Sequence, residues 1–175
     1  MLIYNKKLSV SPLTTHIPLS QVSKKLSKSK MIQKLITINK FYKKYLNKNP
    51  NIGILGLNPH NFSGKKKSEE NEIILPTIKI AKKKGIKVIG PISTDTSFMV
   101  FKKYKFDVIV GMYHDQVLTP LKTLYKFNAI NITLGLPFLR ISPDHGPNNQ
   151  MLGKNKSDPT SLIEALIFLK KINEN

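Results

Sequence analysis

Four short apolar segments, separated by stretches with helical periodicity, constrain the fold of this chain most strongly. They lie at 51–57, 86–90, 106–112 and 129–135, and their lengths suit buried strands. Apolar residues at 29–47 instead recur every three to four positions, which predicts a long amphipathic helix. Strands that alternate with helices predict an α/β fold, with a mostly parallel sheet and helices on both faces.

Capping residues define the helix ends. Ser68 is placed to cap a helix that Gly85 ends, with the acidic pair Glu69 and Glu70 at its positive end. Asp158, followed by proline, predicts the start of the last helix. The stretch between the fourth strand and Asp158 is rich in Gly, Pro and Asn and is predicted as a loop.

The length of 175 residues suits one domain, or one domain with a piece of another. The chain has no cysteine, so disulfides, thiolate metal ligands and a cysteine nucleophile are excluded. No apolar run approaches the roughly 18 residues that a membrane span needs, and the first residues lack the regions of a signal peptide. We therefore expect a soluble cytoplasmic protein without a membrane partner.

The formal net charge of +19 raises the possibility of nucleic-acid binding. Only one of the 29 basic residues, Arg140, is arginine, and the lysines are spread over the whole chain. Readers of bases and phosphates favour arginine for its bidentate fork. This pattern indicates a compositional drift towards lysine, and it predicts no nucleic-acid partner.

Three of the four histidines follow predicted strands. His16 follows an extended segment near 8–15, His60 follows the strand at 51–57, and His114 follows the strand at 106–112. Ligands of open α/β sheets bind beyond the carboxyl ends of the strands. Each histidine alone is typical of an ordinary surface or core residue, but three imidazoles at equivalent places suit Zn²⁺ or a related divalent ion.

Several other polar residues in turns have two readings each. Asp95 and Asp115 are candidates to orient an imidazole or to transfer a proton, and both also suit helix caps. The sequence Asp144-His145-Gly146 suits either catalysis or a turn that requires glycine.

Lys122 and Arg140 are candidates to bind anions. Lys122 also suits a solvated helix face, because lysine is abundant. Arg140 is an arginine despite the drift towards lysine, and its planar guanidinium group suits a carboxylate or phosphate. The alternative is structural, with the Arg140 stem packed on Phe138 and its head paired with Asp144.

The motifs "GLNPH", "GPISTDTSF", "MYHDQVLTPLK", "NITLGLPFLRISPDHG" and "LGK" resemble, in order and spacing, the 4-hydroxythreonine-4-phosphate dehydrogenase family of vitamin B6 biosynthesis. The resemblance runs from about Ser11 to the end of the chain. It implies a divalent metal, Zn, Mg, Mn or Co, held by three histidines with ligands from both subunits in one site. These ligands correspond to His16, His60 and His114. The implied substrate contacts correspond to Lys122, Asn131 and Arg140.

The resemblance also implies the reaction. NAD oxidises the hydroxyl of 4-phosphooxy-L-threonine, a small phosphorylated hydroxy-amino acid, and loss of CO₂ then gives 3-amino-2-oxopropyl phosphate. The chain has no G-x-G-x-x-G motif. NAD is therefore implied by the resemblance alone, and its contacts are unassigned.

Family members are much longer and have two α/β/α domains that flank a cleft, in an isocitrate/isopropylmalate dehydrogenase-like arrangement. The resemblance implies that residues 1–134 form the second domain, which binds metal and substrate, and that residues 135–175 form a C-terminal segment that packs on the first domain. That first domain is incomplete here. The implied partner is a second copy, as a homodimer, or a separate N-terminal half.

Three hypotheses follow. The chain is a truncated or complemented dehydrogenase, or a catalytically inactive remnant that keeps only metal or partner binding, or a basic nucleic-acid module. A reading frame just upstream that encodes the other half would favour the first hypothesis. Steep salt dependence of DNA binding would favour the third.

Overall fold

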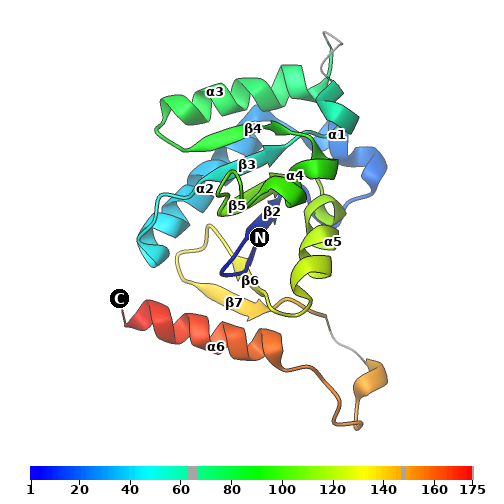
Figure 1. The fold of residues 1–175 in the computed structure, drawn as a ribbon, viewed down its shortest axis with the longest axis vertical. Coiled ribbons are helices and arrows are strands. Elements are labelled where there is room, and N and C mark those ends of the chain that lie inside the picture. Colours follow the sequence, from blue (N-terminus) through cyan, green and yellow to red (C-terminus); the bar gives the residue numbers. More distant parts are fainter. Residues whose placement is uncertain (63–66, 147–148, 175) are drawn as a thin grey trace.

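The computed structural model describes residues 1–62, 67–146 and 149–174. Within these residues, seven strands form one mixed sheet in the order β4-β3-β5-β2-β1-β6-β7 (Figure 1). The strands are β1 (Leu2–Tyr4), β2 (Ser9–Pro12), β3 (Ile52–Leu55), β4 (Val88–Ile92), β5 (Val108–Gly111), β6 (Ile130–Thr133) and β7 (Arg140–Pro143).

Five of these strands run in one direction. β4, β3, β5 and β2 are parallel neighbours. β1 is antiparallel to both β2 and β6, so β6 runs parallel to β2, and β7 returns antiparallel to β6. The carboxyl ends of β2 to β6 therefore share one edge of the sheet, where an α/β protein binds its ligands.

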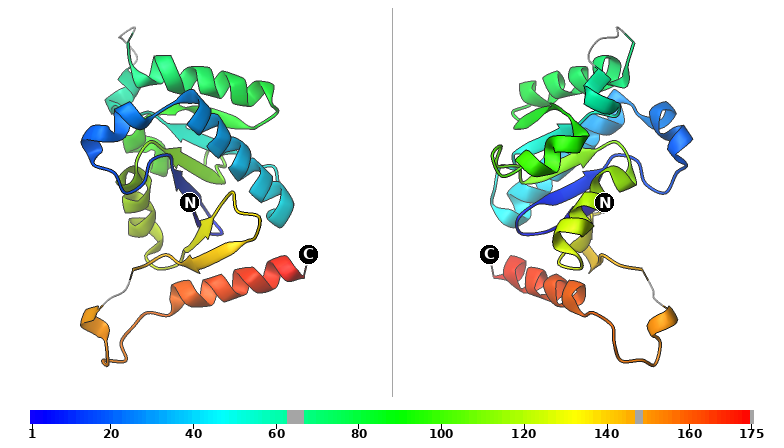
Figure 2. Two further views of the ribbon diagram at one scale, coloured as in Figure 1. Left: turned by 180° about the vertical axis from the view of Figure 1, so that it is seen from behind. Right: turned by 45° about the vertical axis from the view of Figure 1, so that its right-hand side comes forward.

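Helices cover both faces of the sheet, as the sequence predicted. They are α1 (Val22–Lys25), α2 (Lys28–Leu46), α3 (Leu75–Lys83), α4 (Thr94–Val100), α5 (His114–Tyr125) and α6 (Thr160–Asn173). Alternate strand residues point to opposite faces: Ile54 belongs to the core cluster on the face that α2, α3 and α6 cover, whereas Leu55 belongs to the cluster on the face that α4 and α5 cover. Figure 1 shows α5 in front of the sheet, and Figure 2 shows α2 crossing the opposite face.

Helix boundaries match the predictions closely. The long helix predicted at 29–47 is α2, and Ser27 caps it by accepting a hydrogen bond from the Lys30 amide. Ser68 caps the next helix by accepting a bond of 3.3 Å from the Asn71 amide. That helix opens with a π-helical turn at Glu70–Ile74 before α3 begins. Pro76 has no amide hydrogen to donate to the preceding turn, which suits the wider turn there.

Two strands were not predicted from the sequence. β1 and β7 lie outside the four apolar segments, and the loop predicted between β6 and Asp158 is wrong at Arg140–Pro143. Both strands form by pairing with β6, which forms backbone ladders with β1 on one side and with β7 on the other. Short strands at such positions carry little periodicity, so only their tertiary pairing reveals them.

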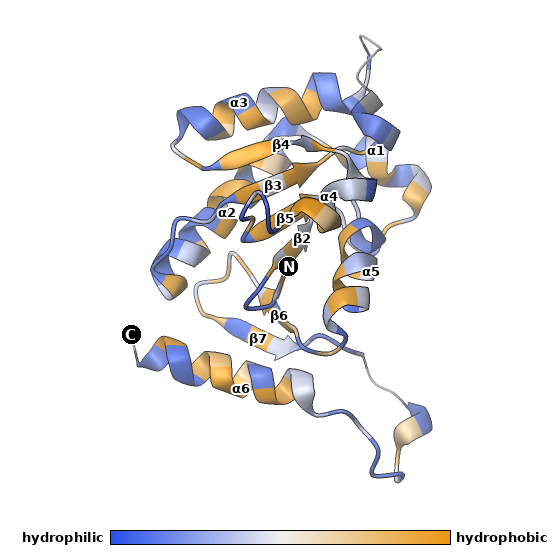
Figure 3. Ribbon diagram, viewed as in Figure 1, coloured by the Kyte–Doolittle hydropathy of each residue, from blue (hydrophilic) through white to orange (hydrophobic). Residues whose placement is uncertain are grey.

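The segment 135–175 joins the same body as the rest of the chain. β7 extends the sheet, and Phe168 of α6 packs against Tyr4 and Phe41 with ring centroids 4.8 and 6.3 Å away. Apolar residues line the strands and recur along α6 (Figure 3). Its docking on a further domain stays a prediction. Within the described part of the chain, no helix is both long and apolar enough to cross a membrane.

Candidate functional site

Three predicted histidines lie at the same edge of the sheet. His16, His60 and His114 follow β2, β3 and β5, which are adjacent in the order β3-β5-β2. The rings of His16 and His114 lie 5.7 Å apart between centroids. Both line a cavity of about 210 Å³ that Asp115 and Thr14 also border. The sheet therefore brings two imidazoles from residues 98 positions apart to one cavity.

The backbone at two of these histidines is strained. His16 has a φ of 50° and His60 a φ of 51°, and Asn61 follows with a φ of 59°. Residues other than glycine rarely adopt this left-handed region, and when they do, the surrounding structure must hold them there. Such strain is typical of sites where a side chain must point in a specified direction.

His60 does not join the other two in this single chain. Among the described residues, no group of three histidine, aspartate or glutamate side chains is arranged to hold a metal ion. His60 instead lies close enough to Asp95 for their charges to interact. The donor chemistry of the His16 and His114 pair fits a borderline divalent ion such as Zn²⁺, but this pair alone leaves the ion short of protein ligands.

The two candidate aspartates have different surroundings. The Asp115 carboxylate lies 2.7 Å from Nδ1 of His114, which leaves Nε2 as the ring nitrogen for another ligand. Asp95 accepts a hydrogen bond of 3.0 Å from the Thr96 amide in the first turn of α4. Asp115 therefore lies where it can orient the His114 ring, whereas Asp95 lies in the first turn of α4, two residues after the N-cap residue Ser93.

Sequence analysis assigned Glu70 to the positive end of a helix, but the structure gives it a further role. Glu70 is only 1% exposed, and its Oε1 accepts 2.8 Å hydrogen bonds from the amides of Leu57 and Asn58. The Asn58 side-chain amide donates to both Glu70 and Glu69, at 3.0 and 2.9 Å. The acidic pair thus holds the turn that presents His60. Two adjacent glutamates were a usable signal in the sequence, because the chain has only 10 acidic residues.

Burial alone would raise the pKa of Glu70, but the hydrogen bonds from Asn58 and Leu57 outweigh it and hold the pKa below its ordinary value of 4.5. The folded state therefore favours the ionised carboxylate. Its stabilisation is fully present above the ordinary pKa and is lost as the pH falls through the folded-state pKa. We expect Glu70→Gln to cost about 1–3 kcal/mol near neutral pH, because its amide group would face the Asn58 donors.

Urea unfolding of both proteins from about pH 7 to about pH 3 tests this expectation. The difference in unfolding free energy should shrink in acid, where the native carboxylate becomes protonated. Glu72→Gln is the matched control, because Glu72 is exposed in the same turn and should change little. A difference that stays constant across this pH range would contradict the role of the Glu70 charge.

Lys122 is paired in this structure. Its Nζ donates 2.6 Å to the backbone oxygen of Asp144 and lies 3.1 Å from Oδ2 of the same residue. Burial raises the pKa of Asp144, and the Lys122 charge opposes that rise. The Asp144 amide donates to Ser161 at the start of α6. Lys122 lies eight residues after His114 on α5, or about 12 Å along the helix axis.

Asn131 and Arg140 lie on the same face of the sheet as α5. Asn131 lies opposite Ile3, which packs in the core beneath α5, and Thr133 lies opposite Arg140. The Arg140 guanidinium donates a 3.0 Å hydrogen bond to the Thr133 hydroxyl. The structural alternative, an Arg140–Asp144 pair, is not what the structure shows, because Asp144 pairs with Lys122.

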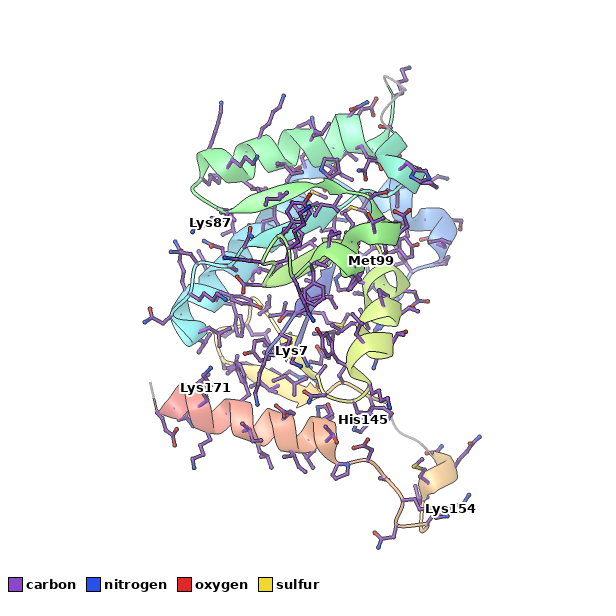
Figure 4. All side chains as sticks on the ribbon, viewed as in Figure 1. Lys7, Lys87, Met99, His145, Lys154 and Lys171 are labelled. Carbon is purple, nitrogen blue, oxygen red and sulfur yellow. The ribbon has the colours of Figure 1, made fainter. Side chains whose placement is uncertain are left out.

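The fourth histidine lies just beyond the end of β7, at the edge of the sheet opposite the other three histidines. His145 contacts Phe127 beyond the carboxyl end of α5, with ring centroids 6.1 Å apart, and Figure 4 shows it far from α3. The fold and the clustered side chains together define a mostly parallel α/β protein with a candidate ligand site at the carboxyl edge of its sheet.

Comparisons with known proteins identify the family. Residues 1–169 match the family described as Pyridoxal phosphate biosynthetic protein PdxA. A 4-hydroxythreonine-4-phosphate dehydrogenase of Sulfurihydrogenibium sp. (strain YO3AOP1) is 48% identical over 179 residues, which cover 99% of this chain and 55% of that protein. The protein of the same name from Aquifex aeolicus (strain VF5) is 42% identical and covers 98% and 53%. The chain belongs to the PdxA family.

A solved structure agrees. The crystal structure of 4-hydroxythreonine-4-phosphate dehydrogenase from Klebsiella pneumoniae superposes with a TM-score of 0.85 at 31% identity, over 98% of this chain and 52% of that one. The chain therefore spans about half the length of the relatives it matches. The fold class that the family resemblance implied is confirmed.

Proposed function

We propose that this chain is the metal- and substrate-binding half of a dehydrogenase that acts in pyridoxal phosphate biosynthesis. The proposed reaction is NAD-dependent oxidation of 4-phosphooxy-L-threonine, followed by loss of CO₂ to give 3-amino-2-oxopropyl phosphate. One observation carries the proposal: His16 and His114, two ligands that the family resemblance implies, meet at one cavity on the carboxyl edge of the sheet.

In this proposal the histidines hold a divalent metal ion. His16 and His114 supply two ligands, and His60 completes the set by a movement of its turn or from a second copy of the chain. Such an ion supplies Lewis-acid stabilisation of negative charge on substrate oxygens. Asp115 keeps the His114 ring oriented through Nδ1. The chain's own contribution is thus a fixed set of donors.

The substrate is held by its anionic groups. Arg140 presents a guanidinium at the histidine edge, held by Thr133, and suits bidentate binding of a phosphate or carboxylate. Lys122 offers a second positive charge on the same side of the sheet, and Asn131 lies between the two on β6. Charges fixed on a rigid sheet lower the entropic cost of positioning the reacting groups.

The second half of the cleft comes from a first domain, on which residues 135–175 dock. The outer surface of α6 supports this docking. The helix buries Ser161, Ala165 and Phe168 and exposes a patch of large aliphatic residues, namely Leu162, Ile163, Leu166, Ile167 and Leu169. Patches of this kind mark interaction surfaces.

Reconstitution tests the proposal. The chain alone, and the chain mixed with the unmatched half of the Sulfurihydrogenibium relative, would be assayed for NADH with NAD, 4-phosphooxy-L-threonine and Zn²⁺, Mg²⁺, Mn²⁺ or Co²⁺. We expect little NADH from the chain alone, because one wall of the cleft is missing and water is not excluded. The mixture should restore turnover.

Two outcomes decide against parts of the proposal. A mixture that forms a stable complex and binds metal, yet produces no NADH, would make this chain a catalytically inactive remnant. Rapid NADH production by the chain alone would show that the cleft needs no second half.

A further inference from the structure

One buried amide connects three separate segments at the histidine edge. Gln116, in the first turn of α5, is only 6% exposed. Its Oε1 accepts a 2.6 Å hydrogen bond from the Met112 amide, and its Nε2 donates to the Gly56 carbonyl oxygen at 2.7 Å and to the Thr94 hydroxyl at 3.0 Å. These hydrogen bonds use the acceptor and both donors of the amide group.

Each partner of Gln116 lies shortly before a candidate site residue. Gly56 directly follows β3 and leads into the turn that contains His60. Thr94 directly precedes Asp95, and Met112 lies two residues before His114. One side chain therefore sets the relative positions of the ends of β3, β4 and β5.

The surrounding glycines show how closely this amide is packed. A Cβ atom on Gly111 would lie 2.9 Å from the Gln116 Oε1 and 2.5 Å from a Val117 methyl group. A Cβ atom on Gly56 would lie 2.3 Å from the side-chain oxygen of Asn61. The strand ends have no side chains at these two places, so backbone and amide approach closely. An apolar group at Gln116 would leave the buried Met112 amide unpaired, and the Gly56 carbonyl would keep only the longer 3.4 Å hydrogen bond from the Thr94 hydroxyl.

We infer that Gln116 is a positioning residue, which holds the segments bearing His60, Asp95 and His114 in register with one another. The inference rests on the proposed metal site for its functional meaning, although its geometry stands without it. A glutamine that only joined α5 to its own strand would need the Met112 bond alone. The bonds to Gly56 and Thr94 instead reach across to β3 and to the start of α4. Loss of the amide should therefore loosen residues that are distant in the sequence.

Two substitutions at Gln116 distinguish the hydrogen bonds that its amide group donates from the one that it accepts. Gln116→Met keeps the length of the side chain and removes all three hydrogen bonds. Gln116→Glu keeps an oxygen for the Met112 amide but, when ionised, has no hydrogen for Gly56 or Thr94. Gln33→Met, on the exposed side of α2, is the matched control.

The measurements are amide hydrogen exchange by NMR, Zn²⁺ affinity by calorimetry and thermal unfolding, all on the full chain. For Gln116→Met we expect faster exchange in 56–61, 93–96 and 112–114 and Zn²⁺ affinity about 10- to 100-fold weaker, the usual effect of losing an outer-shell partner. Gln116→Glu should loosen the first two segments while the Met112 amide stays protected. Gln33→Met should change neither exchange nor affinity.

The outcomes distinguish this inference from the proposed function. Faster exchange confined to α5, with Zn²⁺ affinity unchanged, would overturn the positioning role. An equal rise in exchange over the whole chain in both Gln116 variants would reduce the residue to a general contribution to stability, which also overturns it. If the native chain binds no Zn²⁺, the proposed metal site fails, and the exchange pattern alone still decides whether Gln116 holds the three segments together.

Discussion

His114→Ala should weaken binding of Zn²⁺ by more than about 100-fold, because even the loss of an outer-shell partner costs roughly 10- to 100-fold. His114 lies 5.7 Å from His16 between ring centroids, and Asp115 orients it. The reconstituted enzyme should lose its turnover together with the metal. Thermal stability should change little, since the His114 side chain is 36% exposed and surface substitutions cost little.

His145→Ala is the matched control for this prediction. His145 is also exposed, but it lies against Phe127, beyond the end of β7 and at the edge of the sheet opposite His114. Its replacement should leave both Zn²⁺ affinity and turnover unchanged. Equal losses in the two variants would point to non-specific binding of Zn²⁺ by surface histidines and would contradict the site at the edge of the sheet.

Arg140→Lys should weaken substrate binding in the reconstituted enzyme by about 1–3 kcal/mol, the range for a hydrogen bond to a charged group, or roughly 5- to 150-fold. Lysine keeps the charge but offers no planar fork for a phosphate or carboxylate. Within the part of the chain that the structure describes, the Arg140 side chain donates its hydrogen bond to Thr133, an exposed partner. Stability should therefore be nearly the same as in the native protein, as thermal unfolding and substrate titration together would measure.

Thr133→Val provides the control for Arg140. It removes the hydroxyl that holds the guanidinium and leaves the fork itself in place, so substrate affinity should fall less than in Arg140→Lys. A clear loss of stability in Arg140→Lys, with substrate affinity unchanged, would assign the arginine to the structure of the β6–β7 pair.

Much of the fold could be predicted from local sequence patterns. The apolar segments at 51–57 and 106–112 became β3 and β5, and the helical spacing at 29–47 became α2. Parallel order followed from the alternation of strands and helices, and the shared edge for His60 and His114 followed from that order. These features depend on residues close together in the chain, so periodicity is enough to reveal them.

The direction and partners of individual side chains could not be predicted in this way. Sequence analysis treated Lys122 as a free cation, whereas the fold pairs it with Asp144, 22 positions away. It passed over Gln116 as a donor, because Gly56 lies 60 positions before it. Such contacts arise only when the backbone has closed, and they are then required because a buried polar group without a partner is costly.

The sequence by itself thus determined an α/β sheet with three histidines at the carboxyl ends of predicted strands. Only the tertiary structure decided that β1 and β7 complete the sheet, that β3, β5 and β2 are adjacent, and that His16 and His114 face one cavity. The physical reason is range: strand and helix formation responds to neighbours along the chain, whereas strand pairing and buried hydrogen bonds respond to neighbours in space.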